Sequence, residues 1–216
     1  MTRDTQDFIA QLAADVRPVR RLPAPWQRAL LWFGLVLPYA IVVALIHGAV
    51  LPAESTARFA VEQGAALATS FAATLAAFAT IVPGYNKRIL LLPALPFALW
   101  IASVGYGCVQ DWVQHGPEGL TIRPDWDCLQ PAAILGLVPA LALLLMLRKG
   151  AALQPRLTVA FAGLAVAGIA NFGLQFFHAR DASIMVLVWH LGGAVALACI
   201  GSVLGRRLLP YRTALT

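Results

Sequence analysis

The alternation of long apolar blocks with short charged segments limits the fold of this chain more than any other feature. The blocks lie at roughly 29–51, 59–82, 89–108, 129–147, 157–177 and 183–205. Five of them hold about 20 residues or more, which lets a helix cross a hydrocarbon core of about 30 Å, and block 129–147 is close to that length. We therefore predict an all-α, polytopic membrane bundle of six transmembrane helices.

The basic residues fall on alternate segments between these blocks. The N-terminal segment, the second and fourth loops and the C-terminal tail hold 13 of the 16 Lys and Arg residues, and the other three loops hold one each. Because such residues are enriched in cytoplasmic loops, both termini are predicted to be cytoplasmic. Anionic lipid headgroups then account for the net charge of +6, so no direct nucleic-acid partner is expected.

Three regions follow from this topology. Residues 1–28 are predicted to form a cytoplasmic, partner-binding segment. Residues 29–205 form the transmembrane domain, whose outer loop 109–127 is the longest, and residues 206–216 form a cytoplasmic tail.

The N-terminal segment contains a short amphipathic pattern. Apolar residues from Phe8 to Val16 recur at helical spacing, and Arg17-Pro18 should end the helix before a basic run enters the membrane. The helix could lie on the lipid surface or dock into an apolar groove of a cytosolic protein. The residues assigned to partner binding are Phe8, Ile9, Leu12, Val16, Arg17, Arg20 and Arg21.

Two cysteines bracket the long outer loop. Cys108 ends the third block and Cys128 precedes the fourth, so an oxidising compartment should join them in a disulfide. Closing a loop of about 20 residues stabilises the folded state by about 3 kcal/mol in the entropy model. The pair could be a plain staple or a redox- or metal-sensitive switch. Cys199 lies within the last block and is predicted to be inert packing.

Several polar residues lie at the outer level of the predicted spans. His47, His178 and His190 are weak metal-ligand candidates, because no HxxxH or HExxH spacing is present. Interhelical hydrogen bonding is the favoured role of the polar residues at this level, namely Glu62, Gln63, Asn171 and Gln175. The chain has no phosphate loop and no nucleophile–base constellation, so neither an enzyme nor a cofactor is predicted.

The order of several short motifs resembles the NrsF family of bacterial membrane anti-sigma factors. The motifs are LAADVRPVRRLPAPW (12–26), VPGYNKRILLLPALPFALW (82–100), GCVQDW (107–112), GPEGL (116–120), DWDCL (125–129), FHARDASIMVLVWHLGG (177–193) and LGRRLL (204–209).

The resemblance implies that the N-terminal segment holds an extracytoplasmic-function sigma factor at the inner membrane. It also implies that Cys108 and Cys128 take part in sensing or stabilisation, with release of the sigma factor on metal or oxidative stress. Two other classes of function stay open. A membrane thiol redox protein would need another reactive thiol pair, and a small transporter would need polar residues along the inner half of its spans.

Overall fold

The computed structural model describes residues 3–14, 22–47, 57–116, 129–150 and 152–176, with Gly192, Cys199, Val203, Gly205 and Leu209. These residues are helical or lie in turns, which confirms the predicted all-α class. The elements are α1 (Arg3–Ala14), α2 (Pro25–Ile46), α3 (Ala57–Ala79), the 3-10 helix η1 (Lys87–Leu91), α4 (Ala94–His115), α5 (Leu129–Leu147) and α6 (Pro155–Leu174).

Four helical stretches are long and apolar enough to cross a membrane: Pro25–Ile46, Lys87–His115, Gln130–Leu147 and Pro155–Leu174. Helix α3 has 23 residues, but Arg58, Glu62 and Gln63 lower the hydropathy of its first turns. The described residues thus contain four candidate spans, which is consistent with a helical membrane protein, and the predicted number of six is not shown. Most of the sixth block, 183–205, lies outside the described residues.

The helix boundaries follow the predicted blocks with one large difference. Block 129–147 coincides with α5, and proline at the first helical position starts α2 at Pro25 and α6 at Pro155. Block 89–108 differs from the observed helix at both ends. The helix α4 begins only after η1 and Pro93, and it continues to His115. The predicted outer loop 109–127 is therefore wrong at its start, where residues 109–115 are helical.

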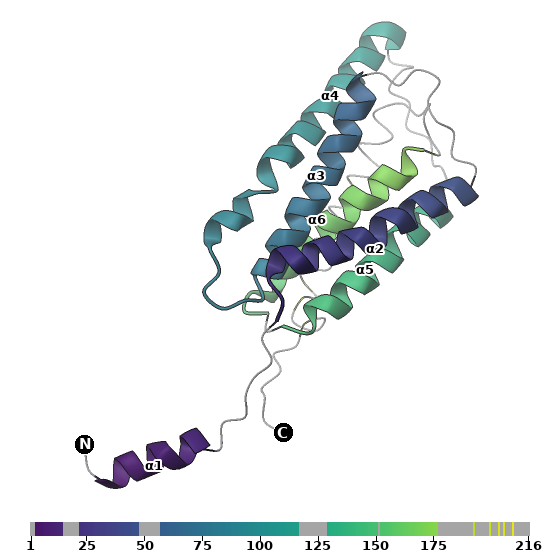
Figure 1. Ribbon diagram of the computed structural model, residues 1–216. Coiled ribbons are helices and arrows are strands. Elements are labelled where there is room, and N and C mark those ends of the chain that lie inside the picture. The colour runs from purple at the N-terminus through teal and green to yellow at the C-terminus, as the bar shows by residue number, and fades with distance from the viewer. Residues whose placement is uncertain are drawn as a thin grey trace.

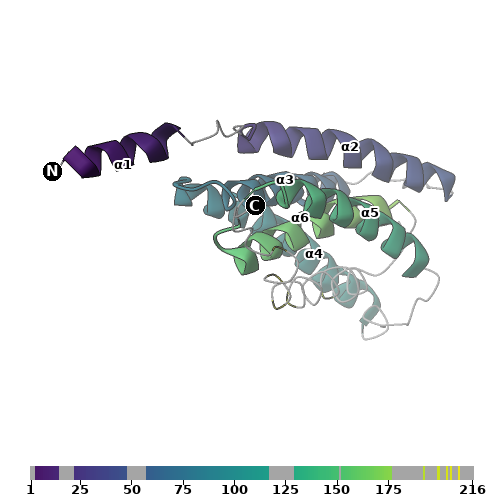
Figure 2. The same cartoon turned by 90° about the horizontal axis from the view of Figure 1, so that it is seen from below.

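Helix α3 lies at the centre of the bundle (Figure 1). It packs against α2, α4 and α6, while α5 packs against α6 and α2. Figure 2 shows α2 and α4 on opposite sides of α3 and α6. The main apolar core joins residues from α2, α3, α5 and α6, among them Trp32, Phe78, Leu143 and Ile169. A smaller cluster holds α4 on α3.

Large apolar side chains cover much of the outer surface of the bundle. On α2 and α4 they include Leu30, Leu35, Leu45, Leu95 and Val113, each at least half exposed. A water-soluble protein rarely exposes a continuous apolar surface of this kind. Lipid is the solvent that such a surface fits, in agreement with the lengths of the helices.

Candidate partner-binding helix and outer polar cluster

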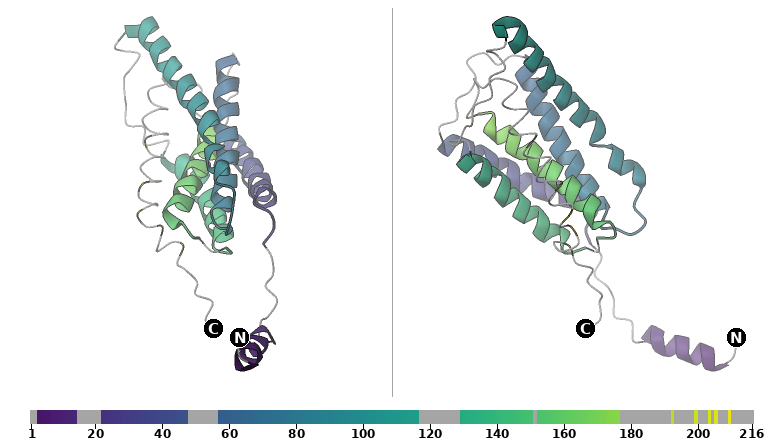
Figure 3. Two further views of the ribbon diagram at one scale, coloured as in Figure 1. Left: turned by 90° about the vertical axis from the view of Figure 1, so that its left-hand side faces the viewer. Right: turned by 180° about the vertical axis from the view of Figure 1, so that it is seen from behind.

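Helix α1 lies apart from the bundle, as the two views of Figure 3 show. All of its described side chains, residues 5–14, are exposed. Phe8, Ile9 and Leu12 are 60%, 48% and 55% exposed, and their spacing places them on one face of the helix. An apolar face this exposed on an amphipathic helix is a docking surface or a lipid contact. The other residues assigned to partner binding, Val16, Arg17, Arg20 and Arg21, lie outside the described residues.

Cys108 lies within α4, about two turns before its end, rather than at the end of a span. Its side chain is partly buried and its thiol is free. Cys128 lies outside the described residues, so the predicted disulfide has no support here. Helix α5 begins at Leu129, directly after Cys128. Cys199 was predicted to be packed inside a span, but its side chain is exposed.

A polar cluster joins the start of α3 to the central and C-terminal parts of α4, at the end of the bundle that the sequence predicts to be outer. Arg58 Nε lies 3.3 Å from Glu62 Oε1, and Arg58 Nη1 donates to Gln110 Oε1 at 3.1 Å. Ser103 Oγ donates to the same Glu62 oxygen at 3.5 Å. Glu62 is buried, and a charged group buried at this level is stabilised by such partners. We call Arg58, Glu62, Ser103 and Gln110 the outer clasp.

The charged residues of the outer clasp lie near Cys108, the cysteine of α4. Asp111, Arg58 and Glu62 are near enough to Cys108 for their charges to act on its thiol. Asp111 stands one helical turn after Cys108, on the same side of α4. Movement of α4 relative to α3 would therefore change the electrostatic surroundings of Cys108. This arrangement can link the position of a helix to the reactivity of a thiol.

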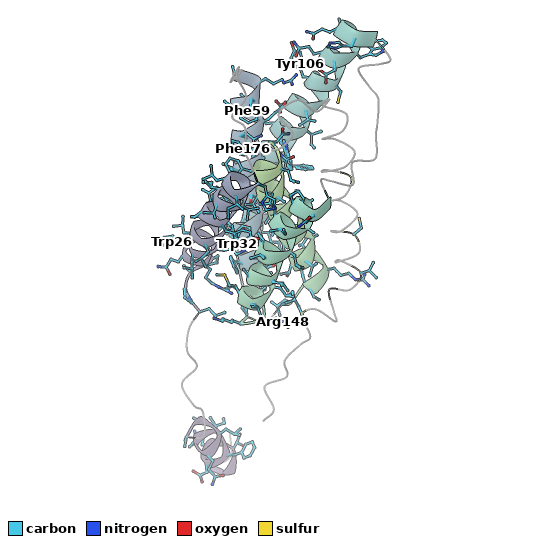
Figure 4. All side chains as sticks on the ribbon, turned by 90° about the vertical axis from the view of Figure 1, so that its right-hand side faces the viewer. Trp26, Trp32, Phe59, Tyr106, Arg148 and Phe176 are labelled. Atoms are coloured by element: carbon cyan, nitrogen blue, oxygen red, sulfur yellow. The ribbon has the colours of Figure 1, made fainter. Side chains whose placement is uncertain are left out.

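The predicted interhelical hydrogen bonding is confirmed for Glu62, which accepts from Ser103 of α4. It is not seen for Gln63: this buried amide has no hydrogen-bond partner among the described residues. Asn171 and Gln175 of α6 are also buried near this level. There the rings of Phe59 and Phe176 meet edge to face at 6.1 Å between centroids, and Figure 4 shows them between the labelled Tyr106 and Trp32.

The histidines do not form a metal site in the part of the chain that is described. His47 caps the C-terminus of α2, and its Nδ1 lies 3.0 Å from Val43 O. No group of three or more potential ligand side chains occurs among the described residues. His178 and His190 lie outside them.

Sequence reasoning missed three members of the outer clasp. Arg58 was counted as an ordinary outer base, and Gln110 was placed in a loop. Ser103 and Gln110 are separated by seven residues, two helical turns, so both lie on one side of α4. That spacing would have predicted the contact only if the helix had been expected to continue beyond Cys108.

Comparison with known protein families gave a match over most of the chain. A family model named NrsF, described as "Negative regulator of sigma F", matches residues 12–211. The match begins in the last turn of α1, so it includes Leu12 and leaves Phe8 and Ile9 outside. No curated protein and no solved structure matches the chain.

Proposed function

Because the chain belongs to the NrsF family of negative regulators of a sigma factor, we propose that it retains a sigma factor at a membrane through its N-terminal segment. The observation that carries this proposal is the exposed apolar face of α1, which lies outside the bundle. A helix with such a face fits an apolar groove on a partner protein. The proposed role is binding, and no catalytic step belongs to it.

We further propose that the partner is a sigma factor of the extracytoplasmic-function type and that the membrane is a bacterial inner membrane. The alternating basic segments support cytoplasmic termini, which would place α1 in the compartment of the partner. The complete bundle would have six spans, with block 183–205 as the last and α3 spanning among the others. The apolar outer surface of the bundle supports direct contact with lipid.

The most detailed part of the proposal is that metal or oxidative stress releases the partner. Its support is the position of Cys108, a free and partly buried thiol beside the charged outer clasp. Oxidation or capture of a soft metal changes the charge and size of a cysteine side chain. Cys128, immediately before α5, would be its partner in either reaction.

A pair of substitutions on α1 tests the proposed binding. Phe8→Asp with Leu12→Asp places two charges on the apolar face and should weaken retention about tenfold or more, because apolar anchors carry most of the binding energy of such interfaces. The measurement is the amount of sigma factor in the membrane fraction per molecule of this protein, with a sigma-dependent reporter in intact cells.

The matched control keeps the number and spacing of the new charges. Gln6→Asp with Ala10→Asp places them on the opposite side of α1, where the structure shows exposed side chains. It should leave retention unchanged. If the Phe8 and Leu12 variant retains as much sigma factor as the unmodified protein, α1 is a lipid-surface helix and the proposed contact is refuted.

A further inference from the structure

Three side chains of α2 donate hydrogen bonds to backbone carbonyls of α5. Arg28 Nη2 donates to Met146 O, Trp32 Nε1 to Pro139 O at 3.2 Å, and Tyr39 OH to Ile134 O at 2.9 Å. The hydrogen bonds have similar spacing on the two helices. At a rise of 1.5 Å per residue, the first and last bonds are about 17 Å apart along α2 and about 18 Å apart along α5. The two antiparallel helices are therefore joined along one line.

Arg28 differs from the other two donors because it carries a charge. It is 5% exposed, and its guanidinium carbon lies 4.3 Å from the centroid of the Phe78 ring. Its Nη1 has no hydrogen-bond partner among the described residues, and no carboxylate among them pairs with it. Burying a guanidinium in this way is costly, so the contacts that it makes must repay the cost.

The contacts of Arg28 connect three helices at one end of the bundle. Met146 is in the last turn of α5, where backbone carbonyls form the negative end of the helix dipole. Phe78 is in the last turn of α3. Arg28 itself lies in the first turn of α2 and is the last residue of the predicted N-terminal segment 1–28. The guanidinium thus ties the start of α2 to the ends of α3 and α5.

We propose that Arg28 is a positioning residue that fixes where the partner-binding segment leaves the bundle and passes displacements of α5 to it. The inference rests on the proposed function. Helix α5 begins directly after Cys128, and Met146 in its last turn accepts from Arg28, so α5 joins the proposed outer side of the bundle to the end of the partner-binding segment. A change in the position of α5 would reach α2 through these three hydrogen bonds.

Substitutions on both sides of the cation–ring contact test this role in the full-length protein. Arg28→Gln removes the charge, and Phe78→Leu removes the ring while α2 stays unchanged. Both should increase the sigma-dependent reporter, by up to about thirtyfold for the ring, because a desolvated cation–π contact has about that effect on an equilibrium. Arg88→Gln removes an exposed cation and should behave as the parent.

The decisive quantity is the sigma factor retained per molecule of protein in the membrane. A purely structural role predicts less membrane protein with unchanged retention per molecule, and this result would overturn the proposal. If Arg28→Gln does not accumulate, Phe78→Leu decides alone, because it leaves α2 unchanged and its retention is measured per molecule. The Phe8 and Leu12 variant separates the two proposals in the same assay. If it releases the sigma factor while the Arg28 and Phe78 variants do not, the positioning role alone fails.

Discussion

The two faces of α3 are held to their neighbours in different ways. Toward α6 the backbones nearly touch: a Cβ atom at Gly168 would stand 2.6 Å from Ala66 O. Ser70 Oγ donates to Ala165 O at 2.7 Å, and the hydroxyls of Thr80 and Thr158 are 2.8 Å apart. Small residues that permit this approach are typical of tight helix pairs in membranes.

Toward α4 the contact depends on a few large or charged side chains. Trp100, Val104 and Gly107 are the buried residues of α4. The outer clasp adds a salt bridge and hydrogen bonds between side chains. Helix α4 can therefore shift on α3 at the cost of these few contacts, whereas α6 cannot shift without opening the core. The helix that carries Cys108 is the one that the bundle holds less tightly.

The largest effect is expected at the α3–α6 contact. Gly168→Leu would force the two backbones apart and should reduce the free energy of unfolding by about 3 kcal/mol or more, with loss of protein from the membrane. The measurement is unfolding of the purified protein from mild detergent into denaturing detergent. Gly64→Ala is the control, since no atom lies within 4 Å of the added methyl group. Wild-type stability of Gly168→Leu would contradict the close packing.

A smaller effect is expected on the α4 face. Trp100→Ala should reduce the free energy of unfolding by about 1–2 kcal/mol, below the value for water-soluble cores, because lipid replaces the lost apolar contacts. Labelling of Cys108 with a maleimide should become faster, because α4 is held less firmly. Tyr106→Ala removes an exposed ring from the side of α4 away from Cys108 and should change neither quantity. A loss as large as that at Gly168 would erase the difference between the two faces.

The smallest effect belongs to the charged part of the outer clasp. Glu62→Gln keeps the shape of the side chain and removes the ion pair with Arg58, which should cost about 0.5–1 kcal/mol since Arg58 is partly exposed. Arg58→Gln should cost somewhat more, because it also removes the hydrogen bond to Gln110, and the double variant should cost less than the sum of the single variants. Additive losses would mean that the two charges do not interact.

The sequence predicted the helices well where hydropathy alone decides their limits. Block 129–147 is apolar throughout and coincides with α5. The prediction failed at α4, because Gln110 and Asp111 lower the hydropathy of a segment that is still helical. Gln110 can remain in the helix since Arg58 of α3 donates to it. Such a contact depends on the rotation and depth of two helices, which apolar blocks do not specify.

The candidate sites show the same limit. The apolar spacing of Phe8 and Leu12 was visible in the sequence, and the structure shows these side chains exposed on a helix. Arg28 was counted among the cytoplasmic bases, but it is buried over Phe78. Its partner Met146 is 118 residues away and contributes only a backbone carbonyl, which any residue would supply. No sequence pattern marks such an acceptor.

The length of the Lys87–His115 stretch has a consequence for the bilayer itself. Its α-helical part, α4, has 22 residues and extends over about 33 Å at 1.5 Å per residue, close to a hydrocarbon core of about 30 Å. Gln110 and Asp111 follow Cys108 by two and three residues, about 3 and 4.5 Å along α4, so the water boundary is expected close to this thiol. Hydrophobic mismatch then moves the water boundary across this thiol: a thicker bilayer covers it with hydrocarbon, and a thinner one leaves it among headgroups and water.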